Sequence, residues 1–164
     1  MLVSRYDESR QVNVVGHAAS MASYAALVTA ALTAGHLRGR SLPERSSGWD
    51  LLLGGVATHK LSRLLAKGSV ASPLRAPFTE FAEAAGLAEH HEHPRGESGV
   101  QHTVGELVTC PFCLGVWLAT AYVGALAVAP RQTRAVASVL GIVAVSDWLH
   151  LGYEVARGKA RASA

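Results

Sequence analysis

Two cysteines lie three residues apart in the stretch Cys110-Pro111-Phe112-Cys113. An apolar segment without formal charge comes directly after them. If that segment is a helix, the pair stands at its N-terminus, where free backbone N–H groups and the positive end of the helix dipole favour a thiolate. A thiolate is both a redox nucleophile and a soft metal ligand. The motif therefore indicates thiol-redox chemistry, metal binding, or two small thiols that pack at a helix end.

A metal site would draw on residues around this motif. Zinc suits a mixed set of nitrogen, oxygen and sulfur ligands, and His102 and Glu106 precede the cysteines at helical spacing. Ligands along one helix cannot all surround one ion, because each residue adds about 1.5 Å of rise. At most the two cysteines and one histidine converge. We expect no cofactor, and the alternative is zinc at Cys110 and Cys113 with His59 or His102 nearby.

An ionisable residue within an apolar helix is costly unless it is paired or functional. Asp147 interrupts the last apolar segment, and we predict that it pairs with Lys60 or Arg63. Together with His150, these residues form a predicted polar cluster inside the membrane. Such a cluster fixes helix packing or provides a path for a proton or small ion.

The composition indicates the elements that position these residues. Of the 164 residues, 49% are hydrophobic and only 16% are charged, which leaves too few polar side chains for the surface of a soluble domain. The net charge of +3 comes from Lys and Arg between the apolar blocks, a pattern of membrane orientation rather than of nucleic-acid binding. We therefore predict an all-α integral membrane bundle of about four helices, with the lipid bilayer as a partner and no nucleic acid.

The apolar blocks set the helix bounds. They predict one membrane domain over 14–153, between an N-terminal tail (1–13) and a basic C-terminal tail (154–164), with helices at 14–37, 49–66, 107–130 and 135–153. Helix 49–66 is ambiguous, because it carries His59, Lys60 and Arg63. It either spans the membrane or lies on its surface, which leaves three spanning helices.

The 67–106 segment is predicted to be a cytoplasmic loop. In both topologies this loop and the C-terminal tail share the face richer in Lys and Arg, which is the cytoplasmic face of a multi-pass protein in a bacterial cell membrane. Phe78, Phe81, Ala82 and Ala85 recur at helical spacing and predict a short interfacial helix. The polar stretch 89–97, with three histidines, is expected to be a mobile loop.

Three stretches resemble the bacterial domain of unknown function 1360 family (DUF1360). They are Ala57-Thr58-His59-Lys60-Leu61-Ser62-Arg63-Leu64, Ser72-Pro73-Leu74-Arg75-Ala76-Pro77-Phe78, and Gly105-Glu106-Leu107-Val108-Thr109-Cys110-Pro111-Phe112-Cys113-Leu114-Gly115-Val116-Trp117. The resemblance covers roughly 49–153. It implies a multi-helix membrane protein, associated in some members with spore-forming bacteria, and it supplies no established activity or catalytic residue.

These observations favour a nonenzymatic structural or interaction component of the bacterial membrane. Its loop would present Pro73, Arg75, Pro77 and Phe78 to a membrane protein, a cytoplasmic protein or a second copy of the chain. The alternative is a thiol-redox or metal-binding membrane protein that uses the Cys110–Cys113 motif. Small-ion or proton transport through the Asp147 and Lys60 region is the third hypothesis.

Overall fold

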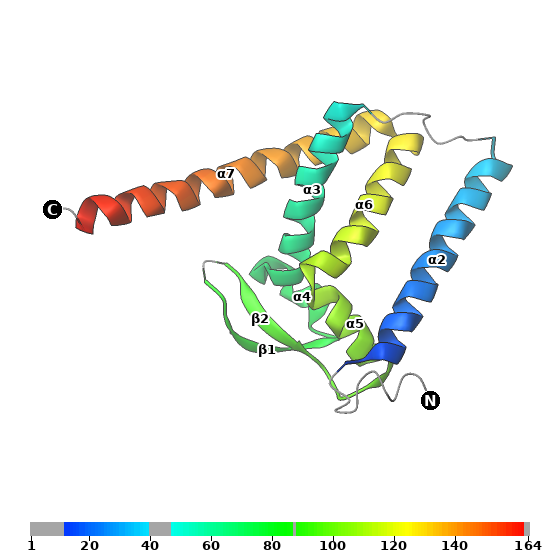
Figure 1. Ribbon diagram of the computed structural model, residues 1–164, viewed down its shortest axis with the longest axis horizontal. Coiled ribbons are helices and arrows are strands. Elements are labelled where there is room, and N and C mark those ends of the chain that lie inside the picture. Colours follow the sequence, from blue (N-terminus) through cyan, green and yellow to red (C-terminus); the bar gives the residue numbers. More distant parts are fainter. Residues whose placement is uncertain (1–11, 40–46, 87, 163–164) are drawn as a thin grey trace.

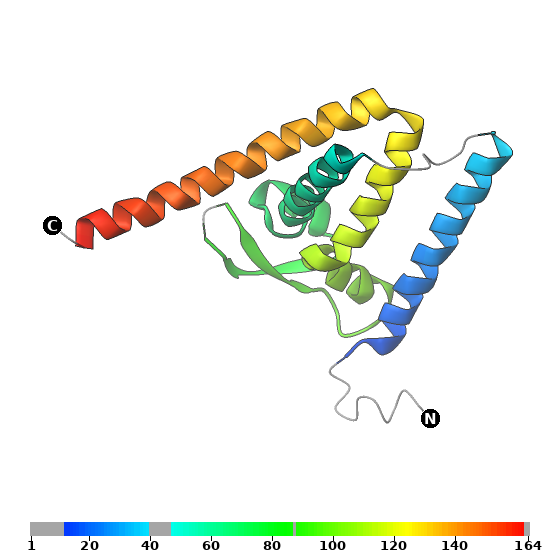
Figure 2. The ribbon, with the colours of Figure 1, turned by 45° about the horizontal axis from the view of Figure 1, so that its top comes forward.

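The computed structural model describes residues 12–39, 47–86 and 88–162, most of which are helical as the sequence predicts. Three helices, α3 (Gly48–Lys67), α6 (Pro111–Val128) and α7 (Pro130–Ala162), pack together, whereas α2 (Val14–Leu37) runs along one side (Figure 1). The turned view shows the C-terminal half of α7 extending away from the other helices (Figure 2).

The first two helices start at caps that the sequence contains. The Asn13 side chain accepts a hydrogen bond from the Gly16 N–H at 3.0 Å, and the Ser47 hydroxyl accepts one from the Asp50 N–H at 3.0 Å. Helix α2 has the predicted bounds, and α3 is one residue longer at each end than predicted. Apart from its last two residues, the predicted N-terminal tail (1–13) lies outside the described residues.

The predicted helix at 107–130 is wrong in one respect, because the helical geometry is interrupted at Cys110. Helix α5 (Gly99–Thr109) ends before it, and α6 begins at Pro111. Proline has no N–H to donate and disfavours helical geometry in the residue before it, and Cys110 accordingly has φ −103° and ψ 106°. The last helix is longer than predicted, so the expected C-terminal tail is helical as far as Ala162.

A small antiparallel hairpin replaces two of the predicted features. Strand β1 (Thr79–Ala84) occupies the expected interfacial helix, and β2 (His90–Pro94) lies in the expected mobile loop. Phe81 stands opposite Glu92, and the register is irregular between Phe81 and Glu83. A short apolar pattern fits either period, and the pairing with β2 decides the outcome because it satisfies the backbone of both segments. The all-α prediction is corrected to this extent.

Two short helices, η1 (Ser69–Ala71) and α4 (Ser72–Arg75), connect α3 to the hairpin. Together with β1, β2 and α5 they make up what we call the polar unit, residues 68–86 and 88–109. The polar unit gathers at one end of the helices (Figure 1). It therefore places the residues of the predicted 67–106 loop in a folded structure rather than an open loop.

The buried centre of the helical part is small. Leu53 and Ala57 of α3 pack against Ala137 of α7, with Tyr122 of α6 beside them. A Cβ at Gly54 would lie 2.3 Å from the Tyr122 ring, so this glycine permits the close approach of α6. Among the described helices, α2, α6 and α7 are long and apolar enough to cross a membrane.

Candidate functional site

The most enclosed ion pair among the described residues lies within the polar unit. The side chains of Arg75, at the end of α4, and Glu92, on β2, are only 2% and 5% exposed. Arg75 Nε donates to Glu92 Oε2 at 2.9 Å, and Nη2 donates to Oε1 at 2.5 Å. This two-bond geometry is the strong form of the arginine–carboxylate interaction.

The same guanidinium also caps the C-terminal end of α3. Arg75 Nη1 donates to the backbone oxygens of Leu65 and Gly68, at 2.7 and 3.0 Å. The last carbonyls of a helix have no partner within it, so Arg75 satisfies acceptors that burial would otherwise leave unpaired. One side chain thus links the C-terminal end of α3 to β2.

Glu92 is surrounded by donors. The hydrogen bonds from Arg75 are the main reason that its pKa falls from the usual 4.5 to about 2, although desolvation acts in the opposite direction. The hydroxyls of Thr79 and Ser72 also donate to its carboxylate, at 2.6 and 3.2 Å. Glu92 is therefore ionised under physiological conditions and holds β1, β2 and α4 together.

The four residues that the sequence predicts to lie on a partner-binding loop differ in their exposure. Pro73 and Pro77 are exposed and Phe78 is half-buried, but Arg75 is enclosed. Arg75 therefore stabilises the polar unit from within, and a partner that docks on this segment would meet Pro73 and Pro77 instead.

Helix α5 packs closely on the hairpin. A Cβ at Gly105 would lie 2.5 Å from the Phe78 oxygen and 2.9 Å from the Pro94 Cα, so only glycine fits this contact without a shift. Gln101 Nε2 donates to the Pro77 oxygen at 2.7 Å and adds a second connection. The hairpin is thereby fixed against α5, the segment that leads into the cysteine motif.

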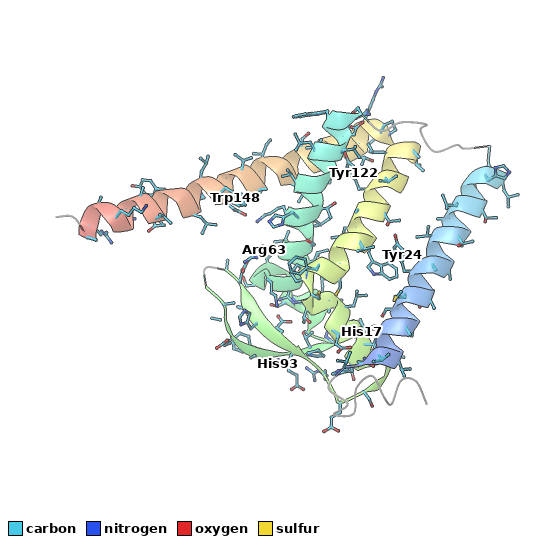
Figure 3. The ribbon with its side chains drawn as sticks, viewed as in Figure 1. His17, Tyr24, Arg63, His93, Tyr122 and Trp148 are labelled. Carbon is cyan, nitrogen blue, oxygen red and sulfur yellow. The ribbon has the colours of Figure 1, made fainter. Side chains whose placement is uncertain are left out.

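The ionisable residues of the predicted membrane cluster have different partners in the structure. Lys60 of α3 donates to the Asp147 carboxylate of α7, which is one of the two pairings that the sequence predicts. Arg63 instead forms a two-bond contact with Glu89 in the polar unit, at 2.7 and 2.8 Å, and it points toward the hairpin (Figure 3). His150 is exposed on α7. The structure thus divides the predicted polar cluster.

Sequence reasoning missed a second pairing, between Asp50 of α3 and Arg134 of α7. Arg134 Nε and Nη2 donate to the two carboxylate oxygens at 2.8 and 2.9 Å, and the Tyr122 hydroxyl donates to the Asp50 backbone oxygen at 2.9 Å. Both charges lie near helix starts, where charged residues are common, so nothing in the sequence set them apart. Tyr122 accordingly lies between α3 and α6 (Figure 3).

The cysteine motif forms a helix cap. Cys110 Sγ accepts a hydrogen bond from the Cys113 N–H at 3.2 Å, and both thiols are free. His102 Nδ1 contacts the Gly96 oxygen at 2.8 Å, and His59 is exposed on α3. Within 12–39, 47–86 and 88–162, no three His, Cys, Asp or Glu side chains are grouped as metal ligands. Zinc stays a prediction that this structure does not test.

Helix α2 reaches the rest of the molecule through a few polar contacts. Asn13 Nδ2 donates to Glu106 Oε2 at 2.7 Å, and the Tyr24 hydroxyl shares a hydrogen bond with that of Thr120 at 2.6 Å. The Tyr24 ring also meets Trp117 edge to face at 5.1 Å. Figure 3 shows Tyr24 on the side of α2 that faces α6.

Comparison with known proteins places this architecture in a family. Residues 52–153 match the family described as protein of unknown function (DUF1360), and the chain belongs to that family, as its motifs indicate. It is similar to "Sporulation protein YjcA" of Bacillus subtilis (strain 168), with 34% identity over 114 residues, which cover 63% of this chain and 96% of the relative. No solved structure matches the chain. Helix α2 precedes the matched family region.

Proposed function

We propose that this protein is a nonenzymatic membrane component that holds its polar unit at the cytoplasmic face as a docking platform. Helices α2, α6 and α7 would span the bilayer, and α3 would pack against α6 and α7 within it. The observation that carries this proposal is the enclosed Arg75–Glu92 pair, which gives a stretch of polar chain a fixed shape next to apolar helices.

The charges in the helical part support a structural role for that part. Lys60 with Asp147, and Asp50 with Arg134, each join α3 to α7. An ionisable residue in an apolar setting is tolerated when a partner on a neighbouring helix satisfies it. These residues would then fix the platform on its membrane anchor. The name of the Bacillus subtilis relative suggests sporulation as the process in which the platform acts.

Topology is the first test. A membrane-impermeant maleimide should label Cys113, the exposed cysteine, only after membranes are opened, because the motif lies at the polar-unit end of α6. A Cys113→Ser chain, which keeps the half-buried Cys110, is the control for the site of labelling. Efficient labelling in intact cells would place the polar unit outside and contradict the proposal.

Docking is tested by a photoreactive amino acid placed on the platform and, as a matched control, elsewhere. Glu80 on β1 and Glu154 on α7 suit this purpose, because their side chains are 63% and 59% exposed. We expect a discrete adduct from position 80, absent from position 154 and lost when Glu92→Gln disturbs the hairpin. Identical adducts at both positions, or none at position 80, would argue against a platform.

The geometry of the cysteine motif favours one alternative function, a thiol-redox or metal-binding role. Cys110 lies where the start of α6 directs a backbone N–H at its sulfur, an arrangement that stabilises a thiolate. Zinc bound in stoichiometric amount after purification, or a Cys110–Cys113 disulfide found in cells by alkylation and mass measurement, would favour this function. Free thiols without metal would favour the structural role.

A further inference from the structure

The segment 70–77, which includes most of η1 and all of α4, has its polar side chains inside and its apolar side chains outside. Ser72 and Arg75 are its only polar residues, and both donate hydrogen bonds to Glu92 within the polar unit. Its exposed residues are all apolar, and we call them the apolar face: Val70, Pro73, Leu74, Ala76 and Pro77. A loop in water usually has the opposite arrangement, because water hydrates exposed polar groups and burial leaves them in need of partners.

The backbone behind the apolar face finds hydrogen-bond partners within the protein. The Arg75 oxygen accepts from the Phe78 N–H at 2.7 Å and from the Thr79 hydroxyl at 3.0 Å, and the Pro77 oxygen accepts from Gln101 Nε2 at 2.7 Å. The two prolines of the segment have no N–H that needs a partner. Acyl chains offer no hydrogen bonds, so a segment in contact with them needs its backbone satisfied in this way. Side chains and backbone of the segment thus both suit contact with lipid.

The segment also lies at the level where the helical part meets the polar unit. Helix α4 lies between the end of α3 and the hairpin (Figure 1), and it contacts α5, which leads into α6. In the first turn of α6, Phe112 is 88% exposed. Because α6 is a candidate span that begins at this end, the boundary between acyl chains and headgroups would fall here.

We propose that the apolar face inserts into the bilayer at the boundary between acyl chains and headgroups, on the side of the membrane that holds the polar unit. This inference rests on the proposed function, which places α6 in the membrane. A bilayer fits the apolar face better than a protein partner does, because the face has no charged or hydrogen-bonding side chain, whereas protein interfaces have a polar rim. The hairpin, with Glu80 and Glu83 exposed, is then the surface available for docking.

The test measures which reagents collide with a spin label on the full chain, reconstituted in vesicles of phosphatidylcholine and phosphatidylglycerol. The changes Cys110→Ser and Cys113→Ser provide a background without thiols, in which serine still serves as the cap of α6. Leu74→Cys and Val70→Cys then carry the label singly on the apolar face, where these residues are 69% and 77% exposed. Oxygen concentrates among acyl chains, whereas a nickel chelate stays in water. The ratio of the two collision rates therefore reports the surroundings of the label.

Two matched positions calibrate this ratio. Glu80→Cys on β1 lies on the polar unit with a side chain that is 63% exposed, and Leu27→Cys lies on α2 and is 61% exposed. We expect the ratio of oxygen to nickel collisions at positions 70 and 74 to approach that at position 27 and to exceed that at position 80 several-fold. Circular dichroism shows whether each variant keeps its helices, and two independent positions on the apolar face guard against one that fails to fold.

Two results would overturn the inference. A ratio at positions 70 and 74 as low as at position 80 would mean that the apolar face is in water. Slow collision with both reagents would mean that protein covers the face, which in these vesicles is a second copy of the chain. In either case, a high ratio at position 27 would leave the proposed membrane location intact, whereas a label at position 27 that the nickel chelate reaches would refute the proposed function as well.

Discussion

At the scale of single residues, Arg75 has a role that its sequence context does not suggest. It lies between two prolines in a basic segment, which is typical of an exposed contact loop, yet its side chain is 2% exposed. Its acceptors are the last carbonyls of α3 and the carboxylate of Glu92, which is 17 residues further along the chain. No local pattern indicates that these acceptors converge.

Replacing Glu92 tests this role. Glu92→Gln leaves the Arg75 charge buried without its counter-charge, and loss of one member of an enclosed pair costs about 3 kcal/mol. We expect faster hydrogen exchange at the β1 and β2 amides in detergent, with the helices retained. Glu83→Gln, on the same hairpin with a side chain that is 71% exposed, is the matched control and should change little. Equal protection in both variants would contradict a structural role for the pair.

The low pKa of Glu92 makes the hairpin sensitive to acid. A carboxyl group with a pKa near 2 in the folded state and 4.5 when released binds its proton more tightly in the unfolded state. Its contribution to stability is therefore complete above pH 4.5 and is lost as pH falls toward 2. The NMR signals of the hairpin amides should lose dispersion over that range in the unchanged protein. The Glu92→Gln chain should lack this transition.

Variants of the Lys60–Asp147 pair test whether it stabilises helix packing. If the pair only stabilises packing, Asp147→Asn should lower stability by about 1–2 kcal/mol, less than for a fully enclosed pair because the Asp147 side chain is 46% exposed. The double change Lys60→Met with Asp147→Leu removes both charges and should recover most of the loss. Thermal unfolding in detergent measures this. A double variant as unstable as the single one would mean that the charges do more than compensate each other.

At the scale of elements, the sequence predicts the long helices well and the polar unit poorly. Apolar blocks long enough to cross a bilayer mark α2, α6 and α7, because a run of about 20 apolar residues is characteristic of a spanning helix. The interruption of the helix at Cys110 could also have been predicted, since Pro111 disfavours helical geometry in the residue before it. The hairpin could not be predicted from the sequence. The apolar spacing of β1 alone indicates a helix, and this segment becomes a strand only when β2 pairs with it.

The contact between α5 and the hairpin gives a prediction at this scale. Gly105→Ala introduces a methyl group 2.5 Å from the Phe78 backbone oxygen, so the backbone must shift, and we expect a loss of about 1–3 kcal/mol with a displaced hairpin. Gly115→Ala in α6 is the control, because a Cβ there meets nothing within 4 Å and alanine favours a helix. Comparison of hairpin amide protection in the two variants measures the effect. Similar values would show that α5 does not brace the hairpin.

At the scale of the whole molecule, the chain has a connected part and a peripheral helix. The polar unit and helices α3, α6 and α7 are joined by the buried centre, by ion pairs between helices and by the Arg75 contacts. Helix α2 is attached chiefly at Asn13 and Tyr24, and most of its residues are exposed. The family match begins at residue 52, which fits this division.

This division predicts unequal effects when helices are removed. A chain that begins at Ser47 loses the Asn13 and Tyr24 contacts but keeps both ion pairs between α3 and α7, so it should remain monodisperse in detergent with its hairpin signals unchanged. A chain that ends at Ala129 deprives Asp50 of Arg134 and Lys60 of Asp147, and it uncovers Leu53 and Ala57. We expect that chain to aggregate, because unpaired charge and exposed core act together. Size-exclusion chromatography of the two shortened chains decides the matter. Aggregation of the chain without α2 would show that this helix is part of the core.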